Sequence, residues 1–349
     1  MINWGVIGCG GIAYRRTIPG MIKAANSRLV AVMDTDLAAA KKVQNEFGVK
    51  FAFDSIDELL AVEEIDAVYI ASPVFCHKEQ VIAAAGAGKH ILLEKPMGLT
   101  TAESVEIDTV CKESGVMLGV GLMMRFNSLH QKLKALISDG KLGEIVSVRS
   151  QFTCWYPEIE GAWRQKLETS GGGALMDMGI HCIDLIRFVS GLEVSEVIAF
   201  TSNQVFSYEV ESAASVIMRM ENEALAYVDA AFNIPDDATV CKLEIYGTEG
   251  SAVIEGSLGQ EESGEGTLII TDSTKGYDAG QNRTKAECTQ LSPERGNLYT
   301  KEVAAFADAI INNGKAPVSS FDAIAAQRIV EAAYLSAAER RAVTVGREK

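Results

Sequence analysis

Near its start the chain carries a glycine-rich hexapeptide that strongly restricts the folds it can adopt. It reads Gly8-Cys9-Gly10-Gly11-Ile12-Ala13, directly follows the apolar residues 4–7 and opens a segment with a helical pattern. Glycines at this spacing permit a tight turn and let backbone amides approach a pyrophosphate at the positive end of a helix. Strand, glycine turn and helix in this order are typical of a dinucleotide-binding α/β domain. The alternative is a purely structural glycine turn.

An acidic residue follows where such a domain requires one. Asp34 comes 24 positions after Gly10, directly after the apolar run 30–33. There its carboxylate would accept hydrogen bonds from the adenosine ribose and repel a 2′-phosphate. No arginine follows Asp34 immediately, so NAD is expected rather than NADP. Lys41 and Lys42 could fold back toward a 2′-phosphate, so NADP is the alternative cofactor.

The first third of the chain alternates short apolar runs with amphipathic stretches. The expected strands are nearly all apolar, which is typical of a parallel sheet covered by helices on both faces. Ser55 and Thr100 are each followed three residues later by glutamate, and each predicts a helix N-cap. The sequence therefore predicts a doubly wound α/β domain over residues 1–122. Its strands are expected at 4–7, 29–33, 51–53, 67–71, 90–93 and 117–122.

From residue 123 the pattern changes. Residues 194–254 contain successive strand patterns joined by short turns, such as Thr248-Glu249-Gly250, which predicts a largely antiparallel sheet. A further strand is expected at 145–152. Residues 123–349 therefore predict a second α/β domain. Its helices are expected at 129–137, 175–189, 302–311 and 323–338.

The composition supports two ordinary domains and excludes several classes of protein. With 349 residues, 48% of them hydrophobic, the chain has enough apolar side chains for two cores. A net charge of −15 without a basic cluster argues against binding of nucleic acids or bilayers. Seven scattered cysteines without a C-x-x-C pair indicate free thiols in a reducing compartment. The chain has neither a leader pattern nor an apolar run of roughly 18 residues, so a cytoplasmic protein is expected.

Two further stretches carry side chains suited to proton transfer. Glu94-Lys95-Pro96 ends the fifth expected strand, at the sheet edge where α/β proteins bind ligands. A lysine there can exchange a proton with a substrate oxygen, and the alternative is a solvated loop start.

Asp177 and His181 are four residues apart on an expected helix and share a face. That pair is compatible with acid/base chemistry, half of a metal site or a structural contact, but no His/Cys cluster completes a metal site. The other histidines are expected at a helix start facing the cofactor, at a strand start and at the surface, for His77, His90 and His130 respectively.

Together these motifs resemble the glucose–fructose oxidoreductase/inositol dehydrogenase (Gfo/Idh/MocA) family over essentially the whole chain. The resemblance implies an N-terminal Rossmann domain and a C-terminal α/β domain with an open, mainly antiparallel sheet. It also implies a small carbohydrate substrate and a homodimer or homotetramer formed through that sheet. The matching positions are Gly8-x-Gly10-x-x-Ala13, Asp34, Glu94-Lys95-Pro96, Trp163-Arg164, Gly172-Gly173, Asp177-x-x-x-His181, Gly247–Gly250 and Asn297–Tyr299.

The resemblance also implies roles for individual residues. Lys95 matches the catalytic lysine, and Asp177 and His181 would face substrate and nicotinamide. Arg125 and Arg164 are candidate substrate contacts that could clamp an anion, Arg164 alternatively serving the cofactor. Val74 replaces the asparagine that the family commonly has after Pro73, which removes one side-chain contact to the cofactor. The expected cofactor-binding residues are Gly8, Gly10, Gly11, Ile12, Ala13, Asp34, Ser72, Pro73, His77, Glu94, Lys95 and Arg164.

The expected activity is reversible oxidation of a secondary hydroxyl on a sugar, sugar derivative or cyclic polyol, with hydride passing to NAD. Lys95 would hydrogen-bond the reacting oxygen, His181 would take or relay the proton and Asp177 would hold a neighbouring hydroxyl. No metal is needed for this chemistry. One alternative is an NAD-dependent glycoside-cleaving enzyme that works by transient oxidation and elimination. Another is a non-catalytic NAD-binding regulator, although the presence of all three side chains argues against it.

Overall fold

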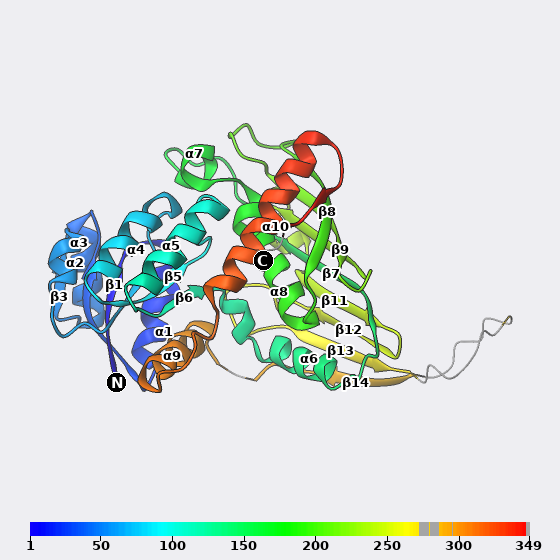
Figure 1. Ribbon diagram of the computed structural model, residues 1–349, viewed down its shortest axis with the longest axis horizontal. Helices are drawn as coiled ribbons and strands as arrows, with labels where there is room; N and C mark the ends of the chain where they lie inside the picture. Colours follow the sequence, from blue (N-terminus) through cyan, green and yellow to red (C-terminus); the bar gives the residue numbers. More distant parts are fainter. Residues whose placement is uncertain (272–278, 280–285, 295, 347–349) are drawn as a thin grey trace. The chain divides into compact units, whose positions relative to one another are not determined.

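The computed structural model describes residues 1–271, 279, 286–294 and 296–346. The backbone forms two compact units (Figure 1). The first unit contains residues 1–123, 161–171 and 296–327, and the second contains the other described residues. The sequence predicts a single boundary after residue 122. The chain first leaves the first unit after residue 123 and then returns to it twice.

The first unit is built on a six-stranded sheet in which all neighbouring strands are parallel. The strand order is β3-β2-β1-β4-β5-β6. This is the order of a dinucleotide-binding Rossmann fold, in which ligands bind at the strand ends where the order reverses, here between β1 and β4. All six predicted strands are confirmed, with small differences at their ends. They are β1 (Ile2–Ile7), β2 (Ser27–Met33), β3 (Phe51–Phe53), β4 (Ala67–Ile70), β5 (His90–Glu94) and β6 (Leu118–Gly121).

Helices cover this sheet because its central strands bury side chains on both faces. Every residue of β4 is buried, as a parallel sheet between two helical layers requires. The Thr100 hydroxyl accepts a hydrogen bond from the Glu103 amide at 3.1 Å, which confirms the predicted cap. Ser55 is the N-cap residue of its helix, as predicted, but its side chain makes no capping hydrogen bond. The helices between the strands are α1 (Ile18–Lys23), α2 (Leu37–Phe47), α3 (Ile56–Leu60), α4 (His77–Gly86) and α5 (Thr101–Glu113).

A helix from the far end of the chain completes the first unit. It is α9 (Leu298–Ile311), which packs against α1 (Figure 1). The Thr300 hydroxyl donates to the Gly20 carbonyl at 2.9 Å, and the ring of Phe306 lies 5.8 Å from that of Trp4. The predicted helix at 302–311 is therefore confirmed, one turn longer at its start. The last long helix, α10 (Ser320–Glu339), confirms the helix predicted at 323–338.

The second unit is built on a nine-stranded sheet. Its order is β14-β13-β12-β11-β7-β10-β9-β8-β15. Of the neighbouring pairs, β7 and β10 are parallel and the others are antiparallel, which confirms a mainly antiparallel second sheet. The strands are β7 (Ile145–Thr153), β8 (Val194–Ser202), β9 (Ala213–Met220), β10 (Leu225–Ala231), β11 (Lys242–Gly247), β12 (Gly250–Glu255), β13 (Glu265–Ile270), β14 (Glu287–Leu291) and β15 (Val343–Thr344).

The two faces of this sheet differ. In β9, Val216 and Met218 are buried, whereas Ile217 between them is exposed. Helix α8 (Ile180–Ser190) packs on the buried face, against β7 and β10. We call the opposite face the outer face. The strand register places four exposed apolar side chains on it, which are Ile198, Phe200, Ile217 and Leu225.

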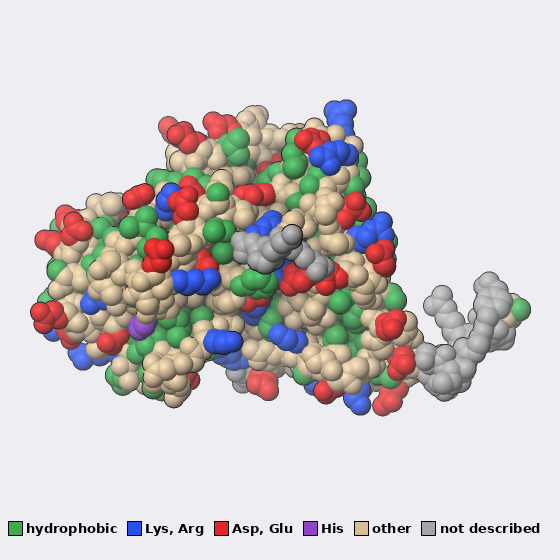
Figure 2. Space-filling view, viewed as in Figure 1, with side chains coloured by type: hydrophobic (Ala, Val, Ile, Leu, Met, Phe, Trp, Pro, Cys, Tyr) green, Lys and Arg blue, Asp and Glu red, His purple; other side chains and the backbone are tan. Residues whose placement is uncertain are grey.

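The surface of the chain reflects its acidic composition. Acidic and basic side chains are interspersed on the face drawn in Figure 2, without a continuous basic area among the residues coloured there. Within the part of the chain that the structure describes, no helix combines the length and the apolar character needed to cross a membrane. All seven cysteines are free thiols, as the sequence predicts.

His130 is a correction to the sequence interpretation. It is expected at the surface, but its ring is fully buried, in α6 (Ser128–Ser138). Nδ1 lies 2.8 Å from the Met124 carbonyl and Nε2 lies 2.9 Å from the Ser257 hydroxyl. A polar ring is stable in a core when both nitrogens find partners, and a single sequence does not reveal those partners.

This burial predicts how stability depends on pH. Burial lowers the pKa of His130 to about 4, from 6.5 for an exposed histidine. Between these values the unfolded chain binds a proton that the folded chain does not, so folded-state stability falls as the pH falls from 6.5 towards 4. Replacing His130 with glutamine removes this dependence. Between pH 7 and pH 5 the wild type should lose about 2 kcal/mol of unfolding free energy relative to the variant. Urea denaturation at the two pH values measures this, and an unchanged difference would contradict it.

Candidate active site

The glycine turn at the end of β1 is shaped by a close approach to the chain after β4. Gly8 has a φ of +93°, and a Cβ there would stand 2.9 Å from the backbone of both Ala71 and Ser72. Only glycine combines this conformation with this spacing. At Gly10 a Cβ would meet no described atom within 4 Å, so the turn is open on that side. A π-helical turn, η1 (Ala13–Thr17), follows and leads into α1.

Asp34 is held in place at the end of β2 by two backbone amides. The Cys9 amide donates to Oδ2 at 2.8 Å, and the Asp36 amide donates to Oδ1 at 3.0 Å. The first of these bonds ties the carboxylate to the glycine turn. Each carboxylate oxygen has a further lone pair, so Asp34 can still accept from hydroxyl groups of a ligand.

A pocket of about 530 Å³ lies against the glycine turn and Asp34, entirely within the first unit. Its volume is in the range of sites for small molecules and cofactors. The predicted cofactor residues that line it are Gly8, Gly10, Gly11, Ile12, Asp34, Ser72, Pro73 and Arg164. Thr35, Ala71, Phe75, Cys76, Gln80 and Trp163 also line it, and the sequence interpretation does not assign them to the cofactor.

The composition of this pocket fits a dinucleotide. The glycine turn offers an open side to a pyrophosphate, and Asp34 offers acceptors for ribose hydroxyls. Arg164 adds a positive charge from the segment 161–171, where its guanidinium lies 4.3 Å from the centre of the Trp163 ring. Phe75 and Pro73 provide apolar surface for flat rings.

Four of the predicted cofactor residues do not line the pocket, because they lie in the protein interior or beyond the end of β5. Ala13 is fully buried in the core beneath the turn. His77 is buried, and both its ring nitrogens face backbone carbonyls rather than the pocket. Glu94 is buried at the end of β5, and Lys95 follows it, half-buried.

Glu94 belongs to a chain of hydrogen bonds beneath Lys95. The Thr17 hydroxyl donates to the Tyr69 oxygen at 2.9 Å, and the Tyr69 hydroxyl donates to Glu94 Oε1 at 2.5 Å. The Lys95 amide donates to Oε2 at 3.2 Å. Burial raises the pKa of Glu94, while the Tyr69 hydrogen bond and the charges of Lys95 and Arg164 act in the opposite direction. These bonds fix the strand end from which Lys95 projects.

A second buried acid lies on α9 in the same unit. Neither carboxyl oxygen of Glu302 has a hydrogen-bond partner among the described residues, and the side chain is almost fully buried. Burial, reinforced by the charge of Glu94, raises the pKa of Glu302 well above its usual value. An unpaired buried carboxylate is very costly, so Glu302 keeps its proton at pH values where an exposed glutamate is ionised.

In the second unit, Asp177 and His181 lie on one continuous helical segment. A π-helical turn, η5 (Leu175–Gly179), passes directly into α8, so the predicted helix at 175–189 is confirmed with a wider first turn. Such turns occur frequently at functional sites. Asp177 is half-buried, and the buried His181 ring packs at 70° to the Phe152 ring, with 6.2 Å between centres. Among the described side chains, no three His, Cys, Asp or Glu residues form a group that could hold a metal ion.

The glycine run before this segment is required by packing. A Cβ on Gly172 would overlap the Tyr334 hydroxyl, and one on Gly173 would overlap the Glu211 carbonyl oxygen. The Glu211 carboxylate accepts from the amides of Gly173 at 2.9 Å and Leu175 at 2.8 Å, and from the Tyr334 hydroxyl at 2.8 Å. Glu211 therefore caps the segment that carries Asp177 and His181. The sequence offers no signal for it, because Glu211 and Tyr334 are far away along the chain.

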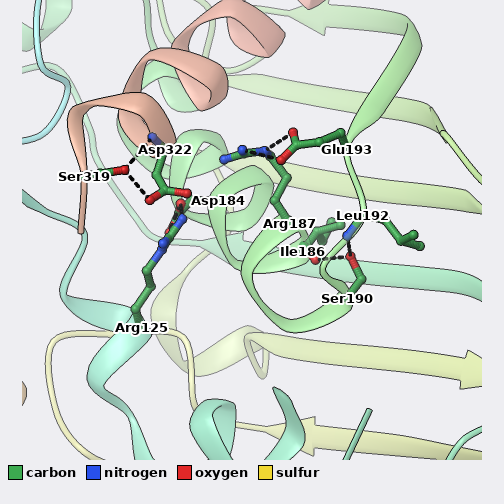
Figure 3. A network of polar contacts seen from close by, with 9 residues as sticks. All are labelled: Arg125, Asp184, Ile186, Arg187, Ser190, Leu192, Glu193, Ser319 and Asp322. Atoms are coloured by element: carbon green, nitrogen blue, oxygen red, sulfur yellow. Dashed lines mark hydrogen bonds and ion pairs between the residues drawn. The ribbon is translucent and has the colours of Figure 1, made fainter. Parts of the chain in front are cut away.

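Arg125, a predicted substrate contact, is paired within the second unit. Its guanidinium reaches Asp184 on α8, with Nε 2.9 Å from Oδ2 and Nη2 2.5 Å from Oδ1 (Figure 3). Both side chains are buried, and two parallel hydrogen bonds of this kind are strong. The charge of Arg125 is thereby neutralised.

Both parts of the chain match models of one protein family. Residues 2–122 match the model described as "Oxidoreductase family, NAD-binding Rossmann fold". Residues 130–253 match the model described as "GFO/IDH/MocA C-terminal domain". The first match covers the parallel sheet and its pocket, and the second covers the helical segment with Asp177 and His181.

Individual relatives extend this similarity over nearly the whole chain. A 1,5-anhydro-D-fructose reductase from Ensifer adhaerens is 29% identical over 325 residues, which are 93% of this chain and 92% of that protein. A D-xylose 1-dehydrogenase (NADP(+)) from Haloferax volcanii is 28% identical, with 97% and 98% covered. A levoglucosan dehydrogenase, solved in complex with NADH and levoglucosan, has a TM-score of 0.87 and 25% identity, with 99% and 100% covered.

Proposed function

Since this chain belongs to the Gfo/Idh/MocA oxidoreductase family, with an NAD-binding Rossmann domain, we propose that it oxidises or reduces a carbohydrate. The reaction is the transfer of a hydride between the nicotinamide of NAD and a secondary hydroxyl or ketone. The substrate is a sugar, a sugar derivative or a cyclic polyol. The names of the relatives support this class, since they act on anhydrofructose, xylose and levoglucosan.

One observation carries the proposal. The first unit holds a pocket of about 530 Å³ with the glycine turn and Asp34 in its wall. Lys95 directly follows β5, and β5 pairs with β4, whose end leads into the pocket residues Ser72 and Pro73. A lysine at the carboxyl end of β5 is at the sheet edge where ligands of such folds bind. The proposal thus combines a site for the dinucleotide with a group that can exchange a proton.

We assign the following roles to the residues of this chain. In the oxidation direction, the residues of the pocket wall would hold NAD, which would supply the hydride acceptor at its nicotinamide C4. Lys95 hydrogen-bonds the substrate oxygen, and the hydroxyl proton passes to Lys95 or His181 as the C=O bond forms. Asp177 accepts a hydrogen bond from a neighbouring hydroxyl and orients the ring. Two electrons leave as hydride and one proton leaves through side chains, so the step balances without a metal.

A panel of sugars, polyols and keto-sugars tests the proposal. Each compound is incubated with NAD or NADH, and absorbance of the reduced nicotinamide is followed. Turnover in either direction is the expected result. The alternative, glycoside cleavage through transient oxidation, recycles the cofactor, so release of an aglycone without net change in NADH would favour it. Tight NADH binding without turnover of any compound would favour a non-catalytic regulator.

The substrate is expected to be neutral rather than anionic. Arg125 is paired with Asp184, and Arg164 lies in the wall of the dinucleotide pocket, so both candidate anion clamps are engaged. The net charge of −15 also slows the approach of an anion. The specificity constant kcat/KM should therefore be higher for a free sugar than for its phosphate ester or uronate. A preference of about tenfold or more for the anionic form, roughly 1.4 kcal/mol, would contradict this expectation.

We also propose that the chain forms a homo-oligomer through the outer face of the second sheet. Four exposed apolar side chains on adjacent strands support this, because such patches mark interaction sites. Sedimentation analysis should show a dimer or tetramer. Ile217→Lys, at the centre of this group, should shift the distribution towards monomer, whereas Ile311→Lys, an exposed apolar residue of α9, should not. A monomeric wild type would disprove the assembly.

A further inference from the structure

The ring of His77 lies between two backbone carbonyls of the first unit. His77 is the first residue of α4 and is 1% exposed. Its Nδ1 is 3.0 Å from the Pro96 carbonyl oxygen, and its Nε2 is 3.0 Å from the Ser72 carbonyl oxygen. The ring therefore connects two loops that are separated by more than twenty residues of sequence.

Both loops belong to the proposed site. Ser72 lines the dinucleotide pocket, and its hydroxyl donates to Gln80, a second pocket residue, at 2.5 Å. Pro96 directly follows Lys95. The position of Lys95 is thus tied from one side by Glu94, through the Lys95 amide, and from the other side by His77, through the Pro96 carbonyl.

The two carbonyls compete for a single proton. A neutral imidazole has one N–H donor, whereas both contacts end on acceptors. Burial, the largest effect, lowers the pKa of His77 to about 4, while backbone hydrogen bonding by Ser72, Pro96 and Met97 acts in the opposite direction. His77 is therefore neutral near pH 7, and only one of its two contacts is a hydrogen bond.

The surroundings decide which carbonyl receives that bond. Pro96 is buried and so is its contact with the ring, so leaving its carbonyl without a donor would be costly. Ser72 is partly exposed in the wall of the pocket, where water or a ligand can donate to its carbonyl. The proton consequently belongs on Nδ1.

We propose that His77 is a positioning residue that fixes Lys95 for catalysis, through an Nδ1–H hydrogen bond to the Pro96 carbonyl. The inference rests on the proposed function of Lys95. His77 itself does not contact the cofactor or substrate. Loss of the bond would let the segment around Lys95 shift, and small misplacements of a catalytic group are costly.

The first test measures the consequences for turnover and binding. His77→Phe keeps a ring but has no donor, and it should lower kcat by about 10²-fold while NADH affinity stays within about threefold. His77→Gln keeps an N–H donor, so its kcat should be at least about fivefold higher than that of His77→Phe. His90→Phe is the matched control, because His90 lies at the opposite end of the strand that precedes Lys95. It should leave both quantities unchanged. Equal losses in His77→Phe and His77→Gln, or a loss confined to NADH affinity, would overturn the proposal.

A double variant separates positioning from a general loss of structure. If His77 acts through Lys95, adding His77→Phe to Lys95→Met should slow turnover by no more than about threefold further, because the two effects are not independent. Additive losses would mean that His77 serves the fold alone.

The second test does not depend on activity. Nitrogen-15 NMR of the wild type distinguishes the two neutral tautomers of His77, and the Nδ1–H form is expected both with and without NADH. An Nε2–H form would refute the proposal even if His77→Phe fails to fold. A wild type that turns over no compound would instead overturn the proposed function, and the NMR result would still stand.

Discussion

Replacing Lys95 with methionine is expected to lower turnover by about 10²–10⁴-fold, the usual effect of removing a positioned acid/base group. Methionine keeps an unbranched side chain of similar length but has no ammonium group. NADH affinity should stay within about threefold, because the pocket wall comprises the glycine turn, Asp34 and Ser72 but not Lys95. The variant should therefore lose turnover while it keeps its affinity for NADH.

Stopped-flow hydride transfer and an NADH fluorescence titration measure these two quantities. Lys112→Met is the matched control: Lys112 is an exposed residue of α5, paired with Asp108 in the same unit. That variant should behave like the wild type in both measurements. Near-normal turnover of Lys95→Met, with full thermal stability, would remove Lys95 from the mechanism and leave His181 as the base to be tested next.

The sequence predicts those features that contiguous residues encode. The strand, glycine turn and helix at residues 2–23 need only local spacing, and Asp34 follows from the length of one β-α-β unit. All-apolar strands such as β4 predict a sheet that is buried on both faces. Fold class, the order of the elements and much of the dinucleotide pocket are therefore predictable without a structure.

Contacts between distant segments are not predictable in this way. Nothing local shows that α9 packs on α1, or that Trp163 and Arg164 lie in the pocket wall with Gly8. The same limit applies to the partners of buried polar groups. His130 is mistaken for a surface residue because its partners Met124 and Ser257 cannot be paired from the sequence. Nothing local shows that Arg125 pairs with Asp184 either. Polar residues are misassigned where a partner on another element changes their environment.

Asp34 is expected to determine the choice between NAD and NADP. Its carboxylate ends β2 in the pocket wall, oriented by the amides of Cys9 and Asp36. Charge-assisted hydrogen bonds to the ribose hydroxyls are worth about 1.5–3 kcal/mol, and the same charge repels a 2′-phosphate. Asp34→Ser should weaken NAD binding about tenfold or more, improve NADP binding and change the affinity ratio by about 100-fold in total.

Two further variants assign this effect to the Asp34 charge. Asp34→Asn keeps the shape of the side chain and should relax the preference in the same direction as Asp34→Ser. Asp36→Ser removes a neighbouring charge while retaining an oxygen that can cap α2, where Asp36 now accepts from the Ala38 amide at 3.0 Å. It should leave the NAD-to-NADP ratio within about threefold of wild type, less than 1 kcal/mol. Titration of each variant with NADH and NADPH gives the ratio directly. A wild type that prefers NADP would contradict the prediction. If Asp36→Ser shifts the ratio as far as Asp34→Ser, the preference arises from the summed charge of the loop and not from hydrogen bonds between Asp34 and the ribose.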